Sequence, residues 1–272
     1  MSRRRTPWPA GFPCWVVLPT PDVAAASVFY GSVLGWTLRP VEDPPGGHVL
    51  AELTEVGELD DGGSRAAVAG LGPLPPDSGP SAWVMSFATG DVDATAADVT
   101  RLGGALLLPP SDAGTLGRLA VAADPTGAVF GLWQAGTHTG VQVVNEPGAF
   151  SWDDLRSTDP GVARAFYRDL FGFVFTEIAP DLDYTTYGTA EGEPPLGGIG
   201  GMFDAPGPSQ WLVCFGVDDA DEAAGATTVG GGTVRVQPHD TPYGRIAELA
   251  DPFGAAFNVI TVDAATMPDR SD

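Results

Sequence analysis

The segment that decides the fold is WDDLRSTDPGVARAFYRDLFGF, residues 152–173, because it reads as a strand, a turn and a helix. Asp159 can cap the helix N-terminus, Pro160 suits the first helical position, and Gly172 can end the helix. The apolar residues between them share one helical face, at Val162, Ala163, Phe166 and Leu170. We therefore predict a short strand followed by a helix that packs on a core.

The same pattern occurs earlier as WVVLPTPDVAAASVFYGSVLGW, residues 15–36. Two later blocks also recur in order, residues 83–91 as 211–219 and residues 117–130 as 244–257. Repetition of order, spacing and residue type over nearly the whole chain predicts two homologous domains of ordinary size. We expect a flexible N-terminus at 1–11, a first domain at 12–138, a linker at 139–148, a second domain at 149–264 and a flexible C-terminus at 265–272.

Each domain reads as strand, helix and strands, followed by a second round of the same order. Short apolar runs separated by Gly and Pro, such as 83–87, 119–122 and 255–260, are typical of strands. Weaker second helices are expected at 92–102 and 219–229. The glycine-rich run 197–201 fits no nucleotide-binding fingerprint and is interpreted as a strand or turn that permits close packing.

Composition excludes several classes of function. The formal net charge is −22, which disfavours nucleic acid and anionic membranes as partners. All 13 basic residues are Arg, so a lysine Schiff base and a P-loop lysine are excluded. The two cysteines are too few for a zinc site or a disulfide framework, and no apolar run is long enough to span a membrane. Prolines interrupt the segment after the arginines at 3–5, so we expect a cytoplasmic protein rather than an exported one.

The doubled βαβββ order, the Asp…Phe-Tyr…Gly helix and the late Asp-Pro-x-Gly turn at Asp124 and Asp251 resemble the vicinal oxygen chelate superfamily. That group includes glyoxalase I, bleomycin-resistance proteins and extradiol dioxygenases. The chain is most similar to its tandem-domain actinobacterial branch, whose members are named glyoxalase-like or hydroxylase. The resemblance implies an α+β fold in which each domain forms a curved mixed sheet with a cup-shaped cavity.

Metal-dependent members of that superfamily carry His, Gln or Glu at four strand positions. The corresponding positions here hold Trp15 and Trp152, Val84 and Leu212, Gly131 and Asn258, and, least securely aligned, Ala69 and Gly201. Only Asn258 among these offers even a weak ligand for a divalent metal. The three histidines, at 48, 138 and 239, are far apart in sequence. We therefore predict no metal and no other cofactor, which disfavours glyoxalase I and dioxygenase activity.

The two domains differ in polarity at matched positions, and the second domain is the more polar. Val17, Asp112, Leu116, Val121 and Gly131 of the first domain become Asp154, His239, Tyr243, Glu248 and Asn258. We expect Asp154, His239, Tyr243 and Glu248 to be catalytic. The predicted substrate-binding residues are Trp152, Arg245, Asn258, Leu212, Trp15 and Val84.

Most of these residues also have a structural interpretation that involves no ligand. The tryptophans at 15 and 152 either stack on a planar ligand or fill a cup that lost its metal. His239 is either an acid/base or a solvated loop residue, and Asp154 is either a base or the partner of Arg245. Arg245 matches Arg118 of the first domain, so it is either a ligand-binding residue or a structural one. Side chains alternate along a strand, which prevents Arg245 and Glu248 from both facing the cup.

The leading hypothesis is a metal-independent protein that binds a small, partly planar organic molecule and transforms it by acid/base chemistry in specialised metabolism. Isomerisation, cyclisation, elimination and cofactor-free hydroxylation are the reaction types considered. The alternatives are a non-catalytic drug-binding protein of the bleomycin-resistance type and, less favoured, a metal-dependent dioxygenase or glyoxalase. A monomer with two pseudo-symmetric domains and a homodimer are both allowed.

Overall fold

The computed structural model describes residues 3–42, 46–54, 65–76, 79–179, 183–190, 192–202 and 207–262. The predicted C-terminal tail at 265–272 lies outside these residues. The first sheet contains β1 Pro13–Thr20, β2 Thr37–Pro40, β3 Val49–Thr54, β4 Arg65–Pro73, β5 Val84–Ala88, β6 Ala105–Asp112, β7 Gly117–Ala123 and β8 Val129–Ala135. The second contains β9 Phe150–Arg156, β10 Val174–Ala179, β11 Tyr184–Gly188, β12 Gly197–Gly200, β13 Gln210–Val217, β14 Thr233–Thr241, β15 Gly244–Ala250 and β16 Ala256–Thr261.

The two sheets have the same topology, which confirms the predicted pair of βαβββ modules in each half. Their strand orders are β2-β3-β4-β1-β5-β8-β7-β6 and β10-β11-β12-β9-β13-β16-β15-β14. In each sheet the opening strands of the two modules pair antiparallel at the centre, and each opening strand pairs parallel with the closing strand of its own module. The chain therefore folds as two copies of one mixed sheet.

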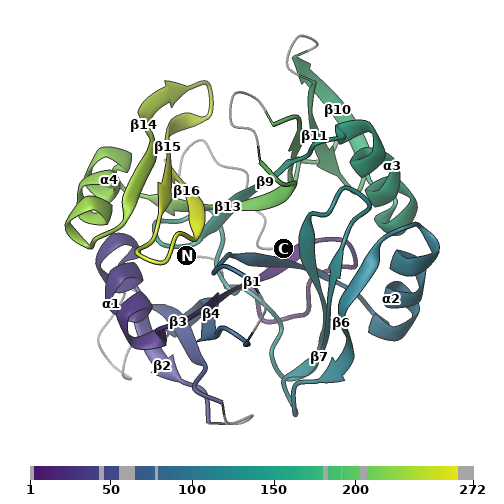
Figure 1. The fold of residues 1–272 in the computed structure, drawn as a ribbon, viewed down its shortest axis with the longest axis horizontal. Coiled ribbons are helices and arrows are strands. Elements are labelled where there is room, and N and C mark those ends of the chain that lie inside the picture. The colour runs from purple at the N-terminus through teal and green to yellow at the C-terminus, as the bar shows by residue number, and fades with distance from the viewer. Residues whose placement is uncertain are drawn as a thin grey trace.

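The four helices are α1 Val23–Leu34, α2 Val92–Arg101, α3 Pro160–Phe171 and α4 Ala220–Val229. The predicted end signals of α3 are confirmed, because the Asp159 side chain accepts a hydrogen bond from the Val162 N–H and Gly172 is left-handed at φ 74°. Figure 1 shows α1 beside α4 on one flank and α2 beside α3 on the other.

The two domains share one hydrophobic core rather than having one each. The α1 side chain of Tyr30 packs on Phe257 of β16, and the α3 side chain of Tyr167 packs on Phe87 of β5. Each first-module helix thus packs against the sheet of the other domain. A single cluster of buried residues extends from Val16 in β1 to Val259 in β16.

The repeated motifs form the polar contacts within this core. Tyr30 donates a hydrogen bond to Asp251 Oδ2 at 3.2 Å and accepts one from the Trp83 indole at 3.0 Å. In the pseudo-symmetric position Tyr167 accepts from the Trp211 indole at 2.9 Å, and burial and the neighbouring Asp124 raise its pKa. The Phe-Tyr and Asp-Pro motifs that recur in the two halves therefore join one domain to the other.

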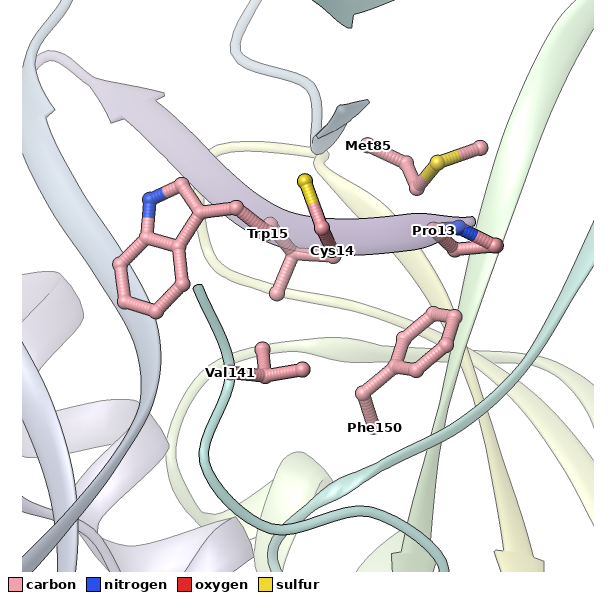
Figure 2. Close-up of a pocket in the computed structure, with 7 residues that line it drawn as sticks. Pro13, Cys14, Trp15, Met85, Val141 and Phe150 are labelled. Carbon is pink, nitrogen blue, oxygen red and sulfur yellow. The ribbon is translucent and has the colours of Figure 1, made fainter. Parts of the chain in front are cut away.

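The described part of the N-terminal segment, residues 3–11, packs against the segment that joins the two domains. Trp8 is 8% exposed, and its indole donates to the Val141 carbonyl at 3.0 Å. The Val141 N–H in turn donates to the Cys14 carbonyl at 2.8 Å. Figure 2 shows Trp15, Val141 and Phe150 gathered around the start of β1, where the packing leaves no space for a water molecule. Apolar contact with the linker orders residues 3–11, which sequence periodicity does not reveal.

No helix in the described ranges is both long and apolar enough to cross a bilayer.

Candidate functional site

The face of the second sheet that turns away from the shared core carries an unusual set of polar side chains. Alternation along β9 puts Leu155 in the core and Trp152, Asp154 and Arg156 on the other face. Strand register adds further residues to that face, namely Leu212 and Cys214 of β13, Asn258 of β16, Glu248 of β15 and Tyr184 of β11. We call this set the polar face.

An ion pair shows that the polar face is concave. Arg156 and Glu248 are three strands apart in the sheet, which corresponds to about 14 Å between strand axes in a flat sheet. Their side chains nevertheless meet, with Arg156 Nη1 at 2.7 Å from Glu248 Oε2. Side chains that stand perpendicular to a flat sheet would not close this gap, so β15 curls over β9.

Asp154 is the centre of a hydrogen-bonded group on this face. Its Oδ1 accepts from the Trp152 indole at 3.1 Å and from the Tyr184 hydroxyl. Gly198, paired with Asp154, makes room for this contact, because a Cβ there would overlap the Tyr184 hydroxyl and lie 2.6 Å from Asp154 Oδ1. The predicted close-packing role of the glycine run thus holds at this position.

The second carboxylate oxygen of Asp154 is free to meet a ligand. No described residue donates a hydrogen bond to Oδ2, and this atom is not among the buried polar atoms that lack a partner. The Asp154 side chain as a whole is partly exposed on this face of the sheet. Asp154 presents one fixed oxygen and one open oxygen.

Burial and neighbouring charges shift the pKa values of Asp154 and Tyr184. Burial raises the pKa of Asp154, although hydrogen bonds from Tyr184 and Trp152 and the charge of Arg156 oppose the rise. Burial and the neighbouring Asp154 also raise the pKa of Tyr184 well above its ordinary value. Tyr184 therefore remains a protonated donor, while Asp154 is a stronger base than an exposed carboxylate.

The matching face of the first sheet is apolar and filled. Trp15 is 8% exposed, and His138, at the end of the first domain, packs edge-on against its ring at 4.2 Å between centroids. Val17 and Val84 pair beside Trp15, and the positions that match Glu248 and Asn258 hold Val121 and Gly131. The burial of Trp15 under His138 favours the filling role for Trp15, whereas the partly exposed Val84 stays a predicted substrate-binding residue away from the polar face.

A cavity of about 280 Å³ does lie near this first sheet, between the N-terminal segment and the end of β8. Trp8, Cys14, Ala88, Trp133 and Thr139 are among its lining residues. Cys14 is the one titratable lining group, and burial raises its pKa far above the ordinary value, so it stays a thiol. This cavity offers a binding space without acid/base groups.

Three predicted site residues lie away from the polar face. Arg245 faces α4, where it pairs with Asp221 and with Asp240, just as Arg118 pairs with Asp93 and Asp112 in the first domain. Both arginines therefore join a strand to a helix. These ion pairs fit the structural interpretation of Arg245, and its predicted role in substrate binding lacks support.

His239 and Tyr243 belong to the exposed edge hairpin of β14 and β15. Tyr243 is 64% exposed in the turn, and His239 Nδ1 lies 3.1 Å from the Gln237 carbonyl oxygen. In strand order His239 is four strands from β9, and no described contact joins it to Asp154. The solvated interpretation of His239 fits this placement, and the catalytic role predicted for these two residues lacks support.

Glu248, Asn258, Leu212 and Trp152 do lie together with Asp154, as the sequence predicts. Three members of the polar face were missed, namely Cys214, Arg156 and Tyr184. Arg156 continues the i, i+2 alternation from Trp152 and Asp154, so one further step along the strand would have found it. Tyr184 comes from β11, and its pairing with this region depends on strand register that composition does not indicate.

Strand register also shows which residues lie beside Trp152 and Asn258, and beside Trp15 and Gly131, at the positions that the resemblance marks for metal ligands. Cys214 lies opposite both Trp152 and Asn258, and Ser86 lies opposite both Trp15 and Gly131. Leu212 and Val84, the residues assigned from sequence, instead pair with Asp154 and Val17. Cys214 is buried with a pKa raised well above its ordinary value, so it is a poor metal ligand.

Comparison with protein families finds one match. The profile described as Glyoxalase/Bleomycin resistance protein/Dioxygenase superfamily matches residues 14–132 and 150–259. Among curated relatives, "Putative glyoxylase CFP32" of Mycobacterium tuberculosis is 38% identical over 263 residues, covering 94% of this chain and 97% of its own. "Anthracycline biosynthesis protein DnrV" of Streptomyces peucetius is 37% identical over 268 residues, covering 92% and 93%.

Solved structures share the fold at low identity. A Mn(II)-bound glyoxalase from Novosphingobium aromaticivorans has a TM-score of 0.63 at 18% identity, covering 98% of this chain and 86% of its own. The 2,3-dioxygenase LapB from Pseudomonas sp. KL28 has a TM-score of 0.65 at 14% identity, covering 98% and 96%.

A divalent metal of the kind in that glyoxalase does not fit the described side chains of the polar face. The row at the matching positions consists of Trp152, Cys214 and Asn258. Within the described ranges, no three His, Cys, Asp or Glu side chains are grouped so that they could hold one ion.

Proposed function

Because the chain belongs to the glyoxalase/bleomycin resistance protein/dioxygenase superfamily, we propose that it binds a small, planar organic molecule on its polar face and transforms it by proton transfer without a metal. The observation that carries this proposal is the Trp152–Asp154–Tyr184 group. Asp154 is the proposed base, and Tyr184 is the proposed donor that holds it in place.

The arrangement of Asp154 supports a role in proton transfer. A general base needs an accessible lone pair and a pKa moved toward the working pH. The open Oδ2 supplies the first requirement, and burial supplies the second by raising the pKa. The Tyr184 hydroxyl fixes the carboxylate orientation, so little reorganisation accompanies the transfer.

The ligand class follows from Trp152 and from the relatives. The partly exposed Trp152 ring, held by its indole hydrogen bond to Asp154, offers a flat surface for stacking. Two relatives, DnrV and DauV, carry the name anthracycline biosynthesis protein. We propose a polycyclic aromatic substrate from specialised metabolism, with isomerisation, cyclisation or cofactor-free hydroxylation as the reaction.

One ligand site per chain is proposed, because the two sheets differ where the polar face lies. The first domain builds the same sheet with Val17, Val121 and Gly131 in place of Asp154, Glu248 and Asn258. The fold therefore does not require these polar groups, which favours a role in binding and chemistry for them.

Hydrogen–deuterium exchange tests the proposal. The probe is methyl anthraquinone-2-acetate, a planar tricycle with an acidic C–H bond, and its deuterium uptake in D2O is followed by mass spectrometry. Wild-type protein should bind it and accelerate uptake, whereas Asp154→Asn should bind it and lose the acceleration. The control is Asp112→Asn, which removes the same kind of charge from an exposed position in the first domain. It should behave like wild type.

The result also separates an enzyme from a drug-binding protein. Binding without accelerated exchange by the wild type would support sequestration of the bleomycin-resistance type. Acceleration that survives in Asp154→Asn would remove Asp154 from the role of base.

A further inference from the structure

Arg156 occupies the position beside Asp154 from which it can contact the same ligand. It lies two residues further along β9 on the polar face, which corresponds to about 6.6 Å along the strand. Its side chain is 18% exposed, and Nη1 donates to Glu248. Its Nε and Nη2 donate to no described residue and are not among the buried polar atoms without partners. The partly exposed guanidinium therefore keeps two N–H-bearing nitrogens without an acceptor among the described residues.

Glu248 holds this guanidinium in place. Its side chain is 9% exposed, and its second oxygen lies 3.9 Å from Arg235 Nη1. A buried ion pair of this kind seldom stabilises a protein more than apolar residues of similar size would. The first domain confirms that the fold does without it, because Pro19 and Val121 stand at the matching positions. The pair therefore calls for a role other than stability.

We propose that Arg156, oriented by Glu248, binds an ionised oxygen of the ligand, which makes the substrate a hydroxylated aromatic ketone or quinone. This inference rests on the proposed function. A C–H or O–H bond of the ligand breaks, its proton goes to Asp154 Oδ2, and the electron pair is delocalised onto the oxygen. Arg156 donates hydrogen bonds to the resulting enolate or phenolate.

The charges around the site are consistent with one bound anion. Among the described residues, the titratable or charged groups that face the proposed site are Asp154, Arg156, Tyr184, Cys214, Glu248 and Arg235. Glu248 is matched by the two arginines, and Tyr184 and Cys214 are neutral. When Asp154 has accepted the proton, the group has one positive charge in excess.

The experiment is a visible-absorbance titration of bound 1,2-dihydroxyanthraquinone, whose phenol changes colour on ionisation. Wild-type protein should bind the ionised form more tightly than the neutral form and so lower the pKa of the bound phenol. Arg156→Gln should weaken binding of the ionised form by roughly tenfold to a hundredfold, the value of a charge-assisted hydrogen bond. Binding of the neutral form should change little.

Two further variants keep the result interpretable. Arg156→Gln leaves Glu248 buried without its partner, so the double variant Arg156→Gln with Glu248→Gln provides the neutral pair if the single variant unfolds. Arg245→Gln is the matched control, because this arginine projects from the opposite face of β15 toward α4. It should bind the dye like wild type.

The outcomes distinguish the two proposals. Dye that binds to wild type and to both Arg156 variants with the same phenol pKa would overturn the anchoring role of Arg156 and leave the ligand site intact. Dye that does not bind to wild type would overturn both. Selective loss of the ionised form in Glu248→Gln, with the neutral form still bound, would support Glu248 as the positioning residue.

Discussion

Replacing Asp154 by Asn should stabilise the protein at neutral pH while it removes the proposed base. The amide oxygen of Asn can accept both hydrogen bonds that now reach Oδ1 from Trp152 and Tyr184. Burial outweighs these bonds and the charge of Arg156, because the net effect on the Asp154 pKa is a rise. The ionised carboxylate therefore costs folding free energy that a neutral amide does not.

The sign and size of the pH dependence follow from this shift. A carboxyl whose pKa is raised on folding binds its proton more tightly in the native state, so native stability falls as pH rises through the native pKa. One such group changes the free energy of unfolding by at most about 1.4 kcal/mol per pH unit. At pH 7 we expect the free energy of unfolding of Asp154→Asn to exceed that of wild type by about 0.5–2 kcal/mol, the usual gain when a destabilising functional residue is replaced.

The assay is urea unfolding of wild type and Asp154→Asn at pH 4.5, 6 and 7.5, followed by tryptophan fluorescence. The difference in unfolding free energy should be smallest at pH 4.5 and should grow in favour of the variant as pH rises. Asp218→Asn, an exposed charge removal, should show no such trend. A variant less stable than wild type at pH 7.5, or a difference independent of pH, would mean that Asp154 is a stabilising structural charge.

Three other predictions follow from particular contacts. Tyr30→Phe should lower the unfolding free energy by about 2–4 kcal/mol, because it leaves the Trp83 indole and an Asp251 oxygen without partners between the domains; a loss below about 0.5 kcal/mol in urea unfolding would refute this. Gly198→Ala should weaken dihydroxyanthraquinone binding at least tenfold by displacing Tyr184, whereas Gly201→Ala, which has open space around it, should not; equal affinities would contradict the assigned site. Burial lowers the pKa of His138 to about 4, so the folded protein favours the neutral ring over the charged one. As pH falls from 6.5 to 4, wild type should therefore lose stability relative to His138→Leu. Parallel pH profiles of the two proteins in thermal unfolding would count against that burial.

The repeated segments predicted the fold because their signals are local. Asp159 and Gly172 bound α3 as expected, and the alternation of Trp152 and Asp154 placed both on one face. The shared core was not predicted, since nothing in the spacing of Phe29 and Tyr30 indicates that they pack on the sheet of the other domain. Contacts between distant segments depend on topology rather than on periodicity.

The candidate site was predicted in part for the same reason. Asp154 and Glu248 were found from polarity differences between matched positions. Arg245 and His239 lie away from the polar face, because neither a shared residue nor a polarity difference shows which face of a strand turns toward the sheet interior. Tyr184 was missed because only the register of β11, β12 and β9 brings its hydroxyl to Asp154.

A crystal structure of the protein with 1,2-dihydroxyanthraquinone is the most direct test of the polar face as the ligand site. The ring should stack on Trp152, with one oxygen within hydrogen-bonding distance of Asp154 Oδ2 and the other near the accessible nitrogens of Arg156. Dye bound only in the cavity beside Trp8 and Trp133, or on the face of the first sheet, would contradict the assignment of function to the second domain.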